Sequence, residues 1–280
     1  MIDFLWLPFS YGFMQRGFAA AVIVGALCAL VGCYVVLRSM AFMGDAMAHA
    51  ILPGIAIAYL LSWNLLFGAL IAAIAVALGI GFFSQGGAIK EDTAIGILFS
   101  AALALGVALI SSIRSYAVDL SHILFGNVLG VSPANLWLIG SLAAAVILTV
   151  VIFYRPFLVV TFDPVLAKTL RMPTGLLRNL MLILLSVTIV ISLQTVGIGL
   201  VAAMLVTPAA AAYMLTRRLP VMMAFSILFG VLSGISGLYL SYYLNIASGA
   251  SIVLVATLIF LLAFFLSPRG RIWRLVHSRR

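Results

Sequence analysis

Long runs of apolar residues fill most of this 280-residue chain and leave little else from which to fold. Hydrophobic residues make up 66% of the sequence and charged residues 8%, whereas a soluble domain carries about 25% charged residues. A helix needs about 20 apolar residues to cross a bilayer. We therefore predict an all-α, polytopic membrane helical bundle of about nine transmembrane segments, with eight as the alternative because several runs are short or interrupted by Gly or Pro. The predicted segments are Gly17–Leu37, Ala46–Ser62, Leu65–Phe83, Ala94–Ile113, Asn135–Tyr154, Arg178–Leu193, Leu200–Thr216, Val221–Tyr242 and Ser251–Leu266.

The basic residues lie in the breaks between these runs, and they predict the orientation. A net charge of +9 could suggest nucleic acid, but Lys and Arg placed in this way mark the cytoplasmic side of a membrane protein. With a cytoplasmic C-terminus, 13 of the 15 basic residues lie inside, and only Arg16 and Arg114 lie outside. We therefore expect the N-terminus outside, the C-terminus in the cytoplasm and no nucleic-acid partner. The residues placed inside are Arg38, Lys90, Arg155, Lys168, Arg171, Arg178, Arg217, Arg218, Arg269, Arg271, Arg274, Arg279 and Arg280.

The spans leave no room for a separate soluble domain, so residues 1–280 are expected to form one transmembrane domain. The aromatic-rich residues 1–16 lack the features of a cleaved signal peptide and are expected to lie at the membrane interface. Residues 267–280 are expected to form a basic cytoplasmic tail. Cys28 and Cys33 share one apolar run without metal-ligand spacing, so we expect small buried residues.

Asp45 and His49 stand inside an apolar tract, four residues apart, and Pro53 follows them. At this spacing two helical side chains lie on one face and can converge on one point. An ionisable residue at membrane depth is costly and by default marks a substrate or ion path, and Asp with His suits Mn, Fe or Zn. In the alternative, Asp45 caps a helix that starts at Ala46, and His49 is only hydrogen-bonded between helices.

A second Asp and His pair lies in the segment Tyr116–Val131, which the predicted topology places outside. Asp119 and His122 are three residues apart and could share a helix face. We favour a loop helix with solvated polar side chains, because no membrane cost has to be explained there. The pair could still attract cations at an outer pore mouth.

The longest inward loop, residues 155–178, contains the signals of a short helix. Asp163 can cap free backbone amides and Pro164 fits a first helical turn. Val165–Leu170 then predicts a short amphipathic helix that Pro173 ends. Such a helix suits docking of a soluble partner, and its alternative is a helix lying passively at the interface. Because the sequence contains no GxxxxGK[ST] phosphate loop and no hydrolase motif, we expect any ATP hydrolysis in a partner chain.

The segment Lys90–Thr93 precedes the fourth predicted span. Glu91 and Asp92 favour a helix N-terminus electrostatically, and Thr93 adds capping potential. That role accounts for them, so we assign them no substrate contact.

Several stretches together resemble the membrane permease subunit of the metal-type ABC importers, the manganese, zinc and iron uptake family. They occur in family order between Met40 and Ala250. The stretches are MAFMGDAMAHAILPGIAIAY, EDTAIGILFSAALALG, LFGNVLGV, FDPVLAKTL, LQTVGIGLVAAMLVTPAAAA and SGLYLSYYLNIASGA.

The resemblance implies that Asp45 and His49 act in metal translocation and that Asp163–Pro173 is the cytoplasmic coupling segment. It implies a homodimer in a bacterial plasma membrane, two ATP-binding subunits beneath it and an extracytoplasmic metal-binding protein. The metal, Mn2+ before Zn2+ or Fe2+, is cargo, and we expect no permanently bound cofactor. One departure is Arg171, where the family usually has Gly. The coupling residues are Asp163, Pro164, Leu166, Ala167, Leu170 and Arg171.

Two other functional classes remain from the sequence. An ion-coupled secondary metal transporter would also contain buried Asp and His, but it would work without an ATPase. A membrane scaffold subunit would use both residues only for packing.

Overall fold

The computed structural model describes residues 7–84, 89–112 and 128–267, and within these ranges the chain forms helices and no strand. Eight helical segments there are long and apolar enough to span a membrane, and a ninth apolar helix, Leu200–Leu215, is shorter. The predicted all-α membrane bundle is therefore confirmed. The elements are η1 (Pro8–Ser10), α2 (Gly12–Leu37), α3 (Ala41–Ala50), α4 (Leu52–Leu60), α5 (Leu65–Phe83), α6 (Glu91–Ser111), η3 (Val128–Gly130), α8 (Pro133–Ile152), α9 (Tyr154–Phe162), α10 (Pro164–Thr169), α11 (Thr174–Val196), α12 (Ile198–Leu215), α13 (Leu219–Leu244) and α14 (Ser248–Leu266).

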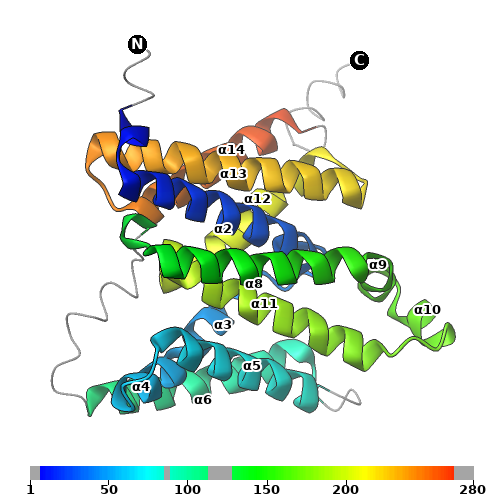
Figure 1. Cartoon of the computed structure of the whole chain (residues 1–280). Coiled ribbons are helices and arrows are strands. Elements are labelled where there is room, and N and C mark those ends of the chain that lie inside the picture. The colour runs from blue at the N-terminus through cyan, green and yellow to red at the C-terminus, as the bar shows by residue number, and fades with distance from the viewer. Residues whose placement is uncertain (1–6, 85–88, 113–127, 268–280) are drawn as a thin grey trace, which may run out of the picture.

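The long helices lie side by side, and α2 lies between α13 and α8 (Figure 1). It packs against α12 and α13, and α13 packs in turn against α14. On the other side, α4, α5 and α6 form a group that meets α3 and α11. Small residues permit the closest of these approaches. A Cβ atom added to Gly25 of α2 would lie 2.6 Å from the carbonyl oxygen of Gly230 in α13.

The described chain enters and leaves the bundle at opposite ends. Near the start of α2, the Tyr11 ring lies 6.5 Å from that of Tyr242 at the end of α13. After α14, the Ser267 hydroxyl donates to the carbonyl of Met214 near the end of α12, at 2.6 Å. The short helix α10 lies at this second end (Figure 1), which we call the α10 end.

Proline divides one predicted segment into two helices, and glycine separates two helices where the sequence prediction also placed a break. The predicted run Ala46–Ser62 is two helices, α3 and α4, because Pro53 has no N–H to continue the helical ladder. Gly197, with φ of 84°, separates α11 from α12, a backbone conformation that glycine adopts without a Cβ clash.

Two further boundaries were wrong. Helix α2 already begins at Gly12, so residues 12–16 belong to a spanning helix rather than to a separate interfacial segment. Much of the loop predicted at 155–178 is helical. A helix, α9, precedes α10 and is held against the bundle by the fully buried Phe157, and α11 already begins at Thr174. Residues 1–6 and 268–280 lie outside the described ranges, so the structure does not test the expected interfacial start and basic tail there.

Candidate functional site

The Asp45 and His49 side chains meet on helix α3. Nδ1 of His49 lies 3.6 Å from a carboxylate oxygen of Asp45 and 3.0 Å from the backbone carbonyl oxygen of Asp45. An Nδ1–H that donates to this carbonyl leaves the Nε2 lone pair free for a metal ion. The predicted convergence of the two side chains is therefore present in the structure.

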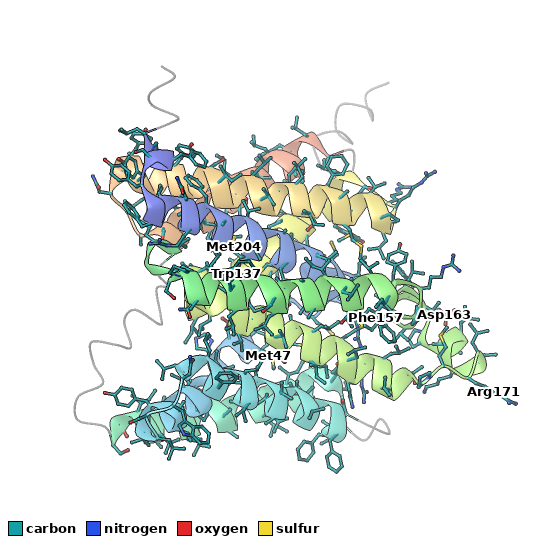
Figure 2. The ribbon with its side chains drawn as sticks, in the orientation of Figure 1. Met47, Trp137, Phe157, Asp163, Arg171 and Met204 are labelled. Carbon is teal, nitrogen blue, oxygen red and sulfur yellow. The ribbon has the colours of Figure 1, made fainter. Side chains whose placement is uncertain are left out.

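Helix geometry turns this pair away from the core of its own chain. Met47, midway between them in sequence, lies on the opposite helix face and is buried (Figure 2). The side chains of His49 and Asp45 remain 28% and 43% exposed. An ionisable pair in a spanning segment is stable against protein or water but costly against lipid.

Side chains and backbone groups around the pair keep it in place. The ring of His49 makes an edge contact with Phe99 of α6, with centroids 6.2 Å apart. At Gly44, α3 lies against α12, and an added Cβ would touch Ala202 and Leu205 at ordinary contact distance. Because Pro53 cannot donate, the carbonyl of His49 loses its regular helical partner, and it accepts instead from the backbone amide of Ile51 at the C-cap of α3.

The alternative role for Asp45 is not supported by the structure. Helix α3 begins at Ala41, with Met40 at the N-cap and no capping side chain. Asp45 therefore sits within the helix and does not cap it. Within the described ranges, no group of three or more His, Cys, Asp or Glu side chains lies together.

The α10 end carries the predicted capping chemistry. The Asp163 carboxylate accepts a 2.8 Å hydrogen bond from the amide of Leu166, and Pro164 occupies the first turn of α10. The predicted short helix is thus confirmed, although it ends at Thr169. Figure 2 places Asp163 and Arg171 together at this end.

Arg171, and not Pro173, ends α10. The amide of Met172 donates to the carbonyl of Ala167, and the amide of Arg171 donates to that of Lys168. These two bonds form a Schellman motif, whose left-handed position usually holds glycine. Arg171 occupies that position with φ of 54°, and Pro173 becomes the N-cap of α11.

Exposed apolar side chains surround the fully buried Ala167 of α10. Val165, Leu166 and Leu170 are exposed by 73%, 45% and 55%. We call these three residues the α10 apolar face. A helix this short is stabilised by what it packs against, and none of the residues that the structure describes covers the α10 apolar face.

The ABC 3 transport family model matches residues 10–267 of the chain. The chain belongs to this family. It is 51% identical over 269 residues to the manganese transport system membrane protein MntC of Halalkalibacterium halodurans, covering 95% of this chain and 92% of that protein. It is 40% identical over 264 residues to the probable iron transport system membrane protein of Haemophilus influenzae, covering 94% and 97%. The solved structure of PsaBC from Streptococcus pneumoniae in complex with Fab is similar, with a TM-score of 0.86, 39% identity and coverage of 98% and 99%.

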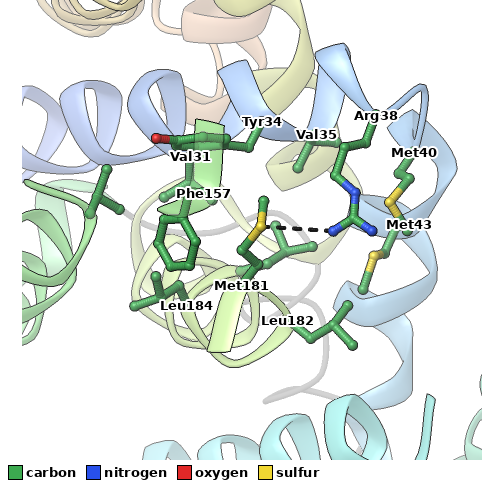
Figure 3. Close-up of a pocket in the computed structure, with 12 residues that line it drawn as sticks. Val31, Tyr34, Val35, Arg38, Met40, Met43, Phe157, Met181, Leu182 and Leu184 are labelled. Atoms are coloured by element: carbon green, nitrogen blue, oxygen red, sulfur yellow. Dashed lines mark hydrogen bonds between the residues drawn. The ribbon is translucent and has the colours of Figure 1, made fainter. Parts of the chain in front are cut away.

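The structure of this ABC 3 family member adds charged contacts that the sequence did not predict. A guanidinium nitrogen of Arg38, at the end of α2, lies 3.3 Å from the carboxylate of Glu91 in α6. Another lies 3.8 Å from the sulfur of Met181 in α11 (Figure 3). Arg178 donates to the carbonyls of Gly81 and Ser84 and so caps the end of α5. From the sequence, Arg38 and Arg178 could only be recognised as basic residues near the ends of spans, and that position does not predict which residues they contact.

Other predicted residues have mixed outcomes. Asp119 and His122 lie outside the described ranges, so their role at an outer mouth stays a prediction. Cys28 and Cys33 are buried and free, as predicted. Glu91 and Asp92 begin α6, also as predicted.

Proposed function

We propose that this chain is the membrane permease subunit of an ABC importer that moves a divalent metal ion into the cytoplasm, with Mn2+ favoured over Zn2+ or Fe2+. One observation supports placing the metal path at Asp45 and His49. Asp45 and His49 converge within a spanning segment yet turn away from the chain's own core. A carboxylate and an imidazole suit these metals, and such residues at membrane depth mark a substrate path.

Two ligands from one chain are too few for a divalent ion. A second copy related by a two-fold axis would bring two Asp45 and two His49 side chains to the same place. The outward direction of the pair supports this homodimer, because a partner copy would shield it from lipid. Binding there must stay weak enough to allow release.

The chain itself is expected to bind and release metal without hydrolysing ATP. Two ATP-binding subunits would dock on the α10 apolar face and drive alternating access. An extracytoplasmic metal-binding protein would deliver the metal to the outer end, where Asp119 and His122 are candidates for attracting cations. The helical cap at Asp163 and the exposed apolar residues after it support docking at α10.

We place the chain in a bacterial plasma membrane with α10 in the cytoplasm. Of the nine described Lys and Arg residues, Arg16 alone belongs to the opposite end, and the positive-inside rule then favours a cytoplasmic α10 end. The N-terminus would be outside and the C-terminus inside. Cysteine-accessibility labelling of both ends tests this, and labelling from one side only would refute it.

Uptake of labelled Mn2+, Zn2+ and Fe2+ by cells that express the permease tests the function. Uptake should require both the permease and its co-purifying ATP-binding subunit, and an ATPase-inactive form of that subunit should stop it. Uptake that survives without the ATPase but collapses with the ion gradient would favour a secondary transporter. Cells that take up none of the metals would favour a scaffold.

A further inference from the structure

A cleft of about 770 Å³ opens at the α10 end, between the coupling segment and the ends of the spanning helices. Arg38 lines it from α2, Glu91 from α6, Lys168 from α10 and Arg178 from α11. We call this the basic cleft. The function proposed above uses none of these four side chains, and the cleft lies beside the α10 apolar face.

The charges of the basic cleft do not balance. Three cationic side chains face one carboxylate, and the Arg38 ion pair already offsets Glu91. Lys168 and Arg178 form no ion pair with any residue that the structure describes. Lys168 is exposed, whereas Arg178 is partly buried and directs its guanidinium to backbone carbonyls. The surplus positive charge favours an anionic occupant.

Unused hydrogen-bond donors add a second indication. Arg178 and Thr161 both line the cleft, and among the residues that the structure describes, Nε of Arg178 and the hydroxyl of Thr161 are buried without a partner. Leaving such groups unpaired is costly. Oε1 of Glu91 also lacks a donor, but that oxygen belongs to the carboxylate that Arg38 neutralises. A carboxylate offers acceptor oxygens to Lys168 and to a guanidinium such as that of Arg178, and arginine binds carboxylates well.

We propose that the basic cleft receives an acidic side chain of the ATP-binding subunit. This inference rests on the proposed function and adds a charged contact to it. A subunit docked on Val165 and Leu166 would cover the neighbouring Lys168, so one partner can supply both the apolar and the acidic contact. Charged contacts at the edge of an interface set the association rate and its salt dependence.

The test uses the full-length permease, purified with its co-purifying ATP-binding subunit, and measures their affinity from about 0.05 M to about 0.5 M NaCl. Lys168→Gln should weaken assembly about fivefold at low salt and flatten the salt dependence. Lys168→Arg should keep the wild-type affinity at low salt and the wild-type salt dependence. Arg155→Gln is the matched control, because Arg155 is an exposed cation of α9 that does not line the cleft.

Three outcomes would overturn the inference. Lys168→Gln could assemble like the wild type while Val165→Asp does not, which removes the acidic contact but keeps docking on α10. Both variants could assemble normally, which also removes the proposed docking surface. Lys168→Gln could differ from the wild type only in phosphatidylglycerol nanodiscs and not in phosphatidylcholine nanodiscs, which would assign the cleft to a lipid headgroup.

Discussion

Arg38 and Glu91 join two helices that are far apart in sequence. Their charged groups lie 3.3 Å apart, with side chains 17% and 21% exposed. Arg38 ends α2, and α3 with Asp45 begins three residues later, after Ser39 turns the chain through a left-handed conformation. The ion pair therefore fixes the turn that leads into α3, the helix that carries Asp45 and His49.

Removing one partner of this pair should destabilise the protein more than removing both. Arg38→Met leaves the Glu91 carboxylate partly buried without a counter-charge, at a cost of about 1–3 kcal/mol in the free energy of unfolding. The double variant Arg38→Met/Glu91→Gln should recover part of that loss. Thermal unfolding in detergent measures all three variants. Strictly additive effects would show that the two residues do not stabilise each other.

Close helix packing at Gly25 gives a second prediction. Gly25→Ala would push α2 and α13 apart, because the added Cβ would lie 2.6 Å from the Gly230 carbonyl oxygen. Overpacking of this kind lowers the free energy of unfolding by about 1–3 kcal/mol. Gly140→Ala in α8 is the control, because nothing lies within 4 Å of its added Cβ. It should be neutral or stabilise by up to about 1 kcal/mol. Equal melting temperatures for the two variants would refute the packing argument.

The left-handed conformation of Arg171 predicts a stabilising substitution. Arg171→Gly should raise stability by about 0.5–1 kcal/mol, since glycine removes the Cβ clash but loses more chain entropy on folding. Asn245 at the end of α13 also has a left-handed backbone. Because asparagine tolerates this conformation, Asn245→Gly should gain less. A lower melting temperature for Arg171→Gly would show that the arginine side chain makes a compensating contact.

The sequence predicted the spanning helices well because each one is a long apolar run, a signal that is local. It also predicted the cap at Asp163, because capping joins residues three apart. The sequence prediction missed the break between α3 and α4 at Ile51. Pro53 was noted, but the run stays apolar across the break and so looked like one helix.

Contacts between residues far apart in the chain could not be predicted from the sequence at this site. Spacing alone placed Asp45 and His49 on one helix face, but their direction depends on which face of α3 packs against α12. The pairing of Arg38 with Glu91 depends on how the group α4 to α6 meets α2. The position of Glu91 and Asp92 at a helix N-terminus already explained both acidic residues locally. The sequence therefore offered no reason to expect the ion pair of Glu91 with Arg38.

Docking on α10 can be tested with one exposed residue. Val165→Asp should strongly reduce assembly with the ATP-binding subunit, because it places a charge in the α10 apolar face, and it should leave the fold intact because Val165 is 73% exposed. Leu61→Asp, an exposed leucine at the opposite end, is the control. Size-exclusion chromatography of both variants measures assembly, and intact complexes with Val165→Asp would exclude α10 as the docking element.

The pair of Asp45 and His49 gives the most direct test of the account. Asp45→Asn keeps the shape of the side chain but removes the charge that a cation needs, and His49→Ala removes the imidazole. A purely structural pair would lose stability when one partner is removed, by about 1–3 kcal/mol. Transport residues should instead lose function while insertion and dimerisation are retained.

The deciding measurement is the initial rate of Mn2+ uptake by Asp45→Asn and His49→Ala cells, at membrane protein levels matched to the wild type. The account predicts that uptake falls to the background of cells without the permease, while each variant still inserts and assembles with its partners. Wild-type uptake in both variants would contradict the assignment of Asp45 and His49 to the metal path.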